Sequence, residues 1–185
     1  QIKLGIREAF LLTFLSWVIC SFFSCLPIYW LSHECTLINA LFESVSSLTT
    51  TGFSTIGNLE ALPKGLILWR AILQWLGGIG IIVMAITVFP VLRIGGMQLF
   101  RSEFSDRSEK ILPRVSQIAA GILYAYTLFT LLGYGGLKLC GLESFDAFCH
   151  AASAISTGGL STRSNGMLFF DSAAVEMILM ALMVV

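Results

Sequence analysis

The chain has 185 residues, of which 56% are hydrophobic and 12% are charged, and its mean hydropathy is +0.86. Soluble globular domains carry about 25% charged residues, so this composition is typical of a protein that lies in a lipid bilayer. Eleven basic and eleven acidic residues give no net charge, which argues against nucleic acid as a partner, because nucleic-acid-binding proteins concentrate positive charge. The five cysteines show no CxxC pair and no metal-ligand spacing, so we interpret most of them as small apolar packing residues. The alternative for Cys35 and Cys140, which fall in predicted loops on one face, is a disulfide bond.

Four apolar stretches are predicted to be membrane-spanning helices, each of which needs about 20 residues to cross the hydrocarbon core. Residues 9–31 contain no charge, and residues 66–92 contain only Arg70. We expect Arg70 to anchor its span at the outer interface by extending its charged end toward water; the alternative is a role in the ion barrier. The third span is 115–137, and a fourth begins near Ala173 and is still apolar at Val185. The chain is therefore expected to end inside a helix.

Two shorter apolar segments lie between these spans. Residues 37–48 follow the first span and residues 145–155 follow the third. Each segment is about a dozen residues long, too short to cross the bilayer, which predicts a re-entrant or interfacial helix. We expect Asn39 to cap the first of these helices and Asp146 to cap the second.

A short polar segment occurs twice, each time directly after one of the short apolar segments. TTTGFST occupies residues 49–55 and STGGLST occupies residues 156–162. Aligned at an offset of 107 residues, the windows 39–55 and 146–162 share Ala40/Ala147, Ser46/Ser153, Thr50/Thr157, Gly52/Gly159, Ser54/Ser161 and Thr55/Thr162. So many identities in so short a window predict a duplicated structural unit.

The distribution of basic residues predicts how the chain is oriented in the membrane. The N-terminus and the segment 93–114 together hold seven of the eleven Lys and Arg residues, so both are expected to be cytoplasmic. The two short segments then enter from the outer side. Because two complete spans separate the copies, the repeat is parallel and can surround one axis, whereas many secondary transporters have inverted repeats. Arg101 and Arg107 should therefore lie on the opposite face from Glu60 and Arg163.

The repeated segment has the composition of a cation path built from backbone carbonyls, which can replace the hydration shell of an ion. Glycine adopts backbone angles that are barred to other residues, and hydroxyl groups can satisfy backbone groups at membrane depth. The C-terminal end of each short helix also carries a partial negative charge. We call residues 50–53 and 157–160 the two filter segments. Their predicted ion-binding residues are Thr50, Thr51, Gly52, Phe53, Thr157, Gly158, Gly159 and Leu160. The alternative for each copy is a simple polar turn.

Longer strings in the chain resemble a known family. They are FESVSSLTTTG at 42–52, RAILQWLGGIGI at 70–81, GGMQLFRSE at 95–103 and FDSAA at 170–174. With the two filter segments, they resemble the TrkH/KtrB potassium uptake proteins, which are related to the plant HKT transporters, over nearly the whole chain. The resemblance implies an all-α, potassium-channel-like membrane protein with parallel helix–pore-loop–helix repeats. Residues 1–92 would form the first repeat, 93–114 a cytoplasmic loop, and 115–185 the second repeat, truncated in its last helix.

The resemblance also implies which residues and partners matter. Gly52 corresponds to the filter glycine of the family, and Gly159 to that of the second copy, with Gly158 as the neighbouring alternative. A glycine at position 52 favours potassium, because a serine replaces it in some sodium-preferring plant relatives. Potassium is then the substrate, bound at the filter carbonyls, and no covalently bound cofactor is expected. The family further implies a bacterial inner-membrane location, a homodimer, and an RCK-type nucleotide-binding regulatory subunit that docks on the 93–114 loop. The alternative for that loop is a solvated segment without a partner.

The main functional prediction is potassium uptake through a carbonyl-lined selectivity filter. The alternative is a proton- or sodium-coupled cation symporter with alternating access, and dependence of the flux on a second ion gradient would separate the two. An intramembrane enzyme is not expected, although Ser54 and Ser161 lie near glycines, because no GxSxG sequence or acid–base partner supports one.

Three further features have two interpretations each. Glu43 either tunes the electrostatic potential of the ion path or makes a structural hydrogen bond, since a carboxylate in a membrane is usually functional or paired. His150, at the equivalent place in the second copy, is interpreted as a structural polar contact rather than a metal ligand. The glycines at 77, 78 and 80 are interpreted as a site of close helix packing.

Overall fold

The structure, a computed structural model, describes residues 6–32, 35–92 and 111–184. Within these ranges every regular element is a helix, so the predicted all-α class is confirmed. The helices are α1 (Ile6–Leu31), α2 (Leu37–Leu48), α3 (Lys64–Leu92), α5 (Ile111–Leu139), α6 (Ser144–Ile155), the 3-10 helix η2 (Gly166–Phe169) and α7 (Ala173–Val184). Parts of α1, α3 and α5 are long and apolar enough to cross a membrane, whereas α7 and α2 are shorter apolar helices.

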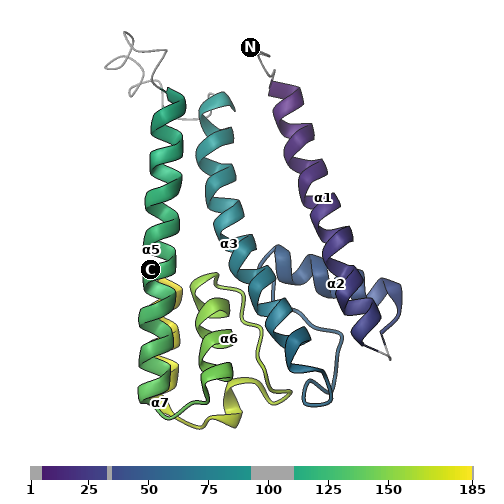
Figure 1. Ribbon diagram of the computed structural model, residues 1–185, viewed down its shortest axis with the longest axis vertical. Coiled ribbons are helices and arrows are strands. Elements are labelled where there is room, and N and C mark those ends of the chain that lie inside the picture. Colours follow the sequence, from purple (N-terminus) through teal and green to yellow (C-terminus); the bar gives the residue numbers. More distant parts are fainter. Residues whose placement is uncertain (1–5, 33–34, 93–110, 185) are drawn as a thin grey trace.

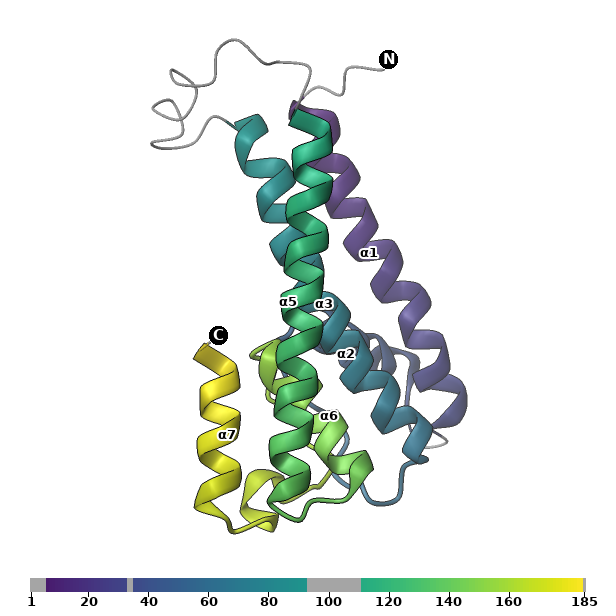
Figure 2. The same cartoon turned by 60° about the vertical axis from the view of Figure 1, so that its left-hand side comes forward.

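The order of a long helix, a short helix and another helix occurs twice along the chain. The long helices α1, α3 and α5 run along the long axis of the molecule, while α2 and α6 both lie in its lower half, on either side of α3 (Figure 1). α7 starts at the lower end and packs beside α5 and α6 (Figure 2). Both predicted short helices are confirmed, α6 beginning one residue earlier than expected.

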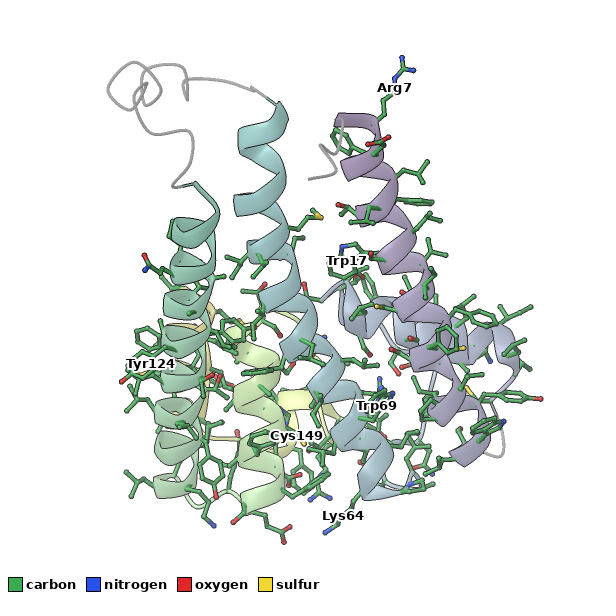
Figure 3. The ribbon with its side chains drawn as sticks, turned by 45° about the horizontal axis from the view of Figure 1, so that its top comes forward. Arg7, Trp17, Lys64, Trp69, Tyr124 and Cys149 are labelled. Carbon is green, nitrogen blue, oxygen red and sulfur yellow. The ribbon has the colours of Figure 1, made fainter. Side chains whose placement is uncertain are left out.

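The two ends of the molecule carry different basic residues. Arg7 of α1 lies at one end and Lys64, the first residue of α3, lies at the other (Figure 3). The filter segments belong to the half that contains Lys64, because they follow α2 and α6. Arg101 and Arg107 lie outside the described residues, so their predicted placement opposite Glu60 and Arg163 stays a prediction.

The helix α2 turns its polar side inward and its apolar side outward. Ile38 is 79% exposed, whereas Glu43 and Ser44 are completely buried. This inverted pattern is expected in a bilayer, where lipid covers apolar side chains and polar side chains join helices by hydrogen bonds. The hydroxyl of Ser44 donates to the carbonyl of Ser21 in α1 at 2.8 Å. Polar contacts of this kind hold α2 against the long helices.

A second donor fixes α1 to α3. The indole Nε1 of Trp69 donates to the carbonyl of Ser24 at 3.1 Å, and Trp69 lies on α3 between the two helices (Figure 3). Around this contact Cys25, Ile28, Ala40 and Leu66 form a buried cluster. The C-terminal half of α1 is thus attached to both α2 and α3.

The caps of the short helices differ from the prediction. Thr36 is the N-cap of α2, and its side chain accepts a hydrogen bond from the backbone N–H of Asn39 at 3.3 Å. The N-cap of α6 is Glu143, without a side-chain cap hydrogen bond. Asn39 and Asp146 are therefore not the caps, because both lie inside the first helical turn rather than before it.

Small residues allow α6 to pack closely on three helices. Ala147, Ala151 and Ala154 are buried and join side chains of α5 and α7 in the largest apolar cluster of the described residues. On the other side of α6, Cys149 packs against Ile67 and Ala71 of α3 (Figure 3). All five cysteines are free thiols, so the alternative disulfide bond between Cys35 and Cys140 is not formed.

The glycines of α3 lie where this helix passes the ends of both short helices. A side-chain carbon at Gly77 would lie 1.9 Å from the carbonyl oxygen of Leu48, at the end of α2. One at Gly78 would lie 2.3 Å from the hydroxyl of Tyr126 in α5 and 3.0 Å from the side chain of Ser156, at the end of α6. Gly80 differs, because its nearest neighbour, the ring of Trp17, would be 3.6 Å away, an ordinary contact. Close helix packing is therefore the role of Gly77 and Gly78.

This difference predicts the outcome of two glycine substitutions in the same helix. Gly77→Ala should lower the stability of the protein by about 1–3 kcal/mol, the usual cost of overpacking, because the end of α2 must move. Gly80→Ala should be nearly neutral. Thermal unfolding of the two detergent-solubilised variants measures both effects, and equal melting temperatures would contradict the assigned contact.

Candidate functional site

Both short helices end in the same hydrogen-bonded turn, which leads the chain into the filter segment. In the first copy the N–H of Thr51 donates to the carbonyl of Ser46 at 2.9 Å. In the second copy the N–H of Gly158 donates to the carbonyl of Ser153, also at 2.9 Å. These two bonds join residues that correspond at the offset of 107, so the sequence repeat is also a repeat of local backbone structure.

The backbone angles of the two filter segments also match. Thr50 and Thr157 have φ of 55° and 54°, and Gly52 and Gly159 have φ of 80° and 77°. Left-handed angles cost a non-glycine residue about 1–2 kcal/mol, so the strain at both threonines is imposed by the surrounding structure. The residues between them, Thr51 and Gly158, are not left-handed. Such alternation of handedness lets successive peptide groups point to one side of the chain.

The two filter segments touch each other through their backbones. A side-chain carbon at Gly52 would lie only 1.7 Å from the carbonyl oxygen of Gly158. Position 52 therefore needs glycine for two reasons, its positive φ and the close approach of a second chain segment. The contact brings the two predicted sets of ion-binding residues together, although Gly52 and Gly158 lie 106 positions apart in the sequence.

The end of the first repeated segment is held by Glu43 of α2. The carboxylate oxygen Oε1 accepts hydrogen bonds from the hydroxyl of Ser54 at 2.9 Å, from the hydroxyl of Thr55 at 3.1 Å, and from the N–H of Thr55. The other oxygen, Oε2, lies 2.8 Å from Arg70 of α3. Through these contacts Glu43 joins α2 to α3 and to residues 54–55, which follow the first filter segment. We call this arrangement a structural brace.

The second copy has a neutral contact at the same place. Nε2 of His150 and the hydroxyl of Thr162 are 3.3 Å apart, and these residues correspond to Glu43 and Thr55 at the offset of 107. His150 is thus a structural polar contact, as interpreted from the sequence. In both copies, the middle of the short helix is bonded to the threonine that ends the repeated segment.

The charged end of Arg70 does not extend toward water, contrary to the sequence-based expectation. Its side chain is 2% exposed and pairs with Glu43, which is completely buried. A buried charge needs a partner of opposite sign, and the carboxylate on the inner side of α2 provides one. The sequence did not indicate this pair, because its two residues lie on different helices, 27 positions apart.

The loops that follow the two filter segments are joined at the end of the molecule that contains Lys64. Glu60 accepts hydrogen bonds from the N–H of Ser164 at 2.9 Å and from the hydroxyl of Ser164. These bonds hold the pKa of Glu60 below its usual value. Arg163 bonds to Asp146 at 3.0 Å, and this hydrogen bond raises the pKa of Arg163. The two repeats are therefore connected outside the filter segments as well.

The side chains of the predicted site differ in exposure. Phe53 is 70% exposed, whereas Leu160, its counterpart, is buried. Among the described residues, no group of three or more His, Cys, Asp and Glu side chains lies close enough to hold a metal ion. The groups available to a cation in the filter segments are thus backbone carbonyls and the hydroxyls of threonine.

One residue at this site was not identified from the sequence as part of it. Gln74 of α3 is completely buried, and its side-chain amide lies against Gly158. A lone glutamine in an apolar span is the only sequence signal, and it did not indicate which loop the side chain would reach.

The two ion pairs of the site are expected to differ in their contribution to stability. Arg70→Met should destabilise the protein by about 3–5 kcal/mol, because it leaves the carboxylate of Glu43 buried without its cation. Arg163→Met, at a pair whose arginine side chain is 30% exposed, should cost about 1 kcal/mol or less. Melting temperatures of the two variants in detergent test this order. Equal losses would contradict the role of the Glu43–Arg70 pair as a buried brace.

Comparisons with known proteins agree with this geometry. The family model TrkH, described as a cation transport protein, matches residues 1–185. The chain is 48% identical over 154 residues to the Trk system potassium uptake protein TrkI of Halomonas elongata, covering 83% of this chain. It is 38% identical over 180 residues to TrkH of Escherichia coli K12, covering 96% of this chain. The named relatives are transport proteins.

A solved structure has the same fold. The crystal structure of the potassium transporter TrkH from Vibrio parahaemolyticus superimposes with a TM-score of 0.82 at 35% identity, covering 98% of this chain and 36% of that one. The chain spans about a third of the length of the relatives that it matches, 31% of TrkI and 37% of E. coli TrkH. The predicted potassium-channel-like fold class is confirmed, and the protein is a multi-pass membrane protein.

Proposed function

This chain belongs to the TrkH family of cation transport proteins, and we propose that it forms one side of a potassium path whose filter is made of backbone carbonyls. The potassium ion is the substrate, and it binds at residues 50–53 and 157–160. The relatives named above are potassium uptake proteins, and the family assignment extends over the whole chain. The action is binding and release of an ion, with no bond chemistry and no resident cofactor.

The contact between Gly52 and the carbonyl of Gly158 is the observation that carries this proposal. Two segments with the same alternating backbone approach each other from the same half of the molecule (Figure 1). If they lay on opposite faces, or if either continued as an unbroken spanning helix, they could not contribute to one filter. Each short helix ends before its filter segment, α2 at Leu48 and α6 at Ile155, which supports a shared ion path.

The architecture and the partners belong to the same proposal. Residues 1–92 and 115–185 act as two parallel repeats, and the N-terminus and the loop 93–114 face the cytoplasm of a bacterial cell. Glu43 acts in the first repeat mainly as a brace for the returning chain, supported by its four contacts. We further propose a homodimer in the inner membrane that binds an RCK-type regulatory subunit through the loop 93–114.

Potassium flux tests the proposed function directly. The full-length protein, reconstituted in liposomes with its regulatory subunit, should take up potassium or rubidium. The rate should not depend on an imposed proton or sodium gradient if the ion moves through a pore. Absence of any potassium or rubidium flux would refute the proposed function, and strict dependence on a second gradient would favour the coupled symporter.

Substitution of Gly52 tests the filter assignment. Gly52→Ser should lower the potassium-to-sodium flux ratio by about fivefold or more, since about 1 kcal/mol of difference between two ions corresponds to this factor. The physical cause is displacement of the Gly158 carbonyl by the new side chain. Gly57→Ser is the matched control, because Gly57 lies in the same loop with nothing within 4 Å of an added side-chain carbon. An unchanged ratio in Gly52→Ser would contradict the role of Gly52 as a filter residue.

A further inference from the structure

Gln74 is a polar side chain buried in a membrane-spanning helix, where such groups are costly unless they have partners. It is 0% exposed. Its carbonyl oxygen Oε1 accepts a hydrogen bond from the hydroxyl of Ser153 in α6 at 2.7 Å. Its amide nitrogen Nε2 has no hydrogen-bond partner among the described residues. One end of the side chain is therefore fixed, and the other end is a buried donor without an acceptor.

The free end of this amide lies at the junction of the two filter segments. A side-chain carbon at Gly158 would lie 2.3 Å from Nε2 and 2.7 Å from Oε1 of Gln74. A side-chain carbon at Gly52 would lie 3.6 Å from the same Nε2. The amide thus occupies the space that a side chain at position 158 would need, beside the point where the Gly158 carbonyl meets Gly52.

The two copies differ at this point. In the first copy, the hydroxyl of Ser46 donates directly to the filter carbonyl of Phe53 at 2.6 Å. Ser153 corresponds to Ser46, but its hydroxyl donates to Gln74 instead of to a filter carbonyl. Gln74 therefore stands between the short helix and the filter segment in the second copy, where the first copy has a direct bond.

We propose that Gln74 is a positioning residue of the ion path, which connects Ser153 to the second filter segment and holds the Gly158 carbonyl in register with Gly52. The inference rests on the proposed function, because a filter must exist for its register to matter. The side chain does not coordinate the ion. It acts by packing: the hydrogen bond from Ser153 holds the amide in place, and the amide fills the space against the backbone of Gly158.

The substitution Gln74→Met tests this role, because methionine keeps the length and approximate volume of the side chain but removes both polar groups. In the full-length protein, reconstituted in liposomes, the potassium-to-sodium flux ratio should fall roughly fivefold, the scale of one lost hydrogen bond. Trp75→Phe is the matched control. It removes another polar link of α3, the bond from the indole to Thr130 of α5 at 3.0 Å, and leaves the contact of Gln74 with Gly158 untouched.

Each result then has a definite meaning. A lowered ratio in Gln74→Met, with a ratio of wild-type size in Trp75→Phe, supports the proposal whatever happens to the melting temperatures. An unchanged ratio in Gln74→Met, or an equal fall in both variants, overturns it. If the wild-type protein passes potassium and Gln74→Met keeps the wild-type ratio, only this inference fails. If the wild-type protein passes no potassium, the proposed function itself fails.

A second variant decides the matter if Gln74→Met does not accumulate in the membrane. Ser153→Ala removes the donor that fixes Oε1, so the amide can rotate away from Gly158, while the side chain of Gln74 stays in place. The flux ratio should fall in the same direction as in Gln74→Met. A wild-type ratio in Ser153→Ala would overturn the proposal.

Discussion

A backbone segment that leaves the helical path inside a bilayer has no water to bond, so its N–H and C=O groups need partners from the protein. In the first copy, side chains of α2 bond to the backbone of the repeated segment 49–55. The hydroxyl of Ser46 bonds to the carbonyl of Phe53, and the carboxylate of Glu43 bonds to the N–H of Thr55. The buried polar face of α2 supplies these hydrogen-bond partners. The long helices hold α2 in the position from which its side chains reach residues 53 and 55.

The helix α3 connects the two filter segments because it contacts both short helices. Gly77 admits the carbonyl of Leu48, at the point where α2 ends. Three residues earlier, close to one helical turn, Gln74 reaches the second filter segment. A helix with larger residues at 77 and 78 would keep α2 and α6 apart, and Gly52 would then not reach the carbonyl of Gly158. The glycines of α3 thus limit how closely the two filter segments can approach each other, although neither segment belongs to α3.

The two copies have similar backbone angles in their filter segments but different side-chain contacts around them. The φ angles of Thr50 and Gly52 match those of Thr157 and Gly159 within a few degrees. The first copy, however, has a charged brace, Glu43 with Arg70, where the second has His150 with Thr162. A chain that contributes two unlike segments to one path can place different donors around it. Identical chains arranged around one axis cannot place different donors in this way, because each substitution would appear at every equivalent position.

The sequence alone determined the elements whose signals are local. Apolar length indicated the long helices, the short apolar runs indicated α2 and α6, and the repeat at an offset of 107 indicated two equivalent loops. Only the tertiary structure decided which distant residues meet: the burial of Arg70 on Glu43, the contact of Gly52 with Gly158, and the approach of Gln74 to the second filter segment. Hydropathy and periodicity depend on neighbours along the chain, whereas these contacts depend on where α3 passes between two other helices. A single sequence records that a polar residue is present in a span, but the packing of the helices determines its partner.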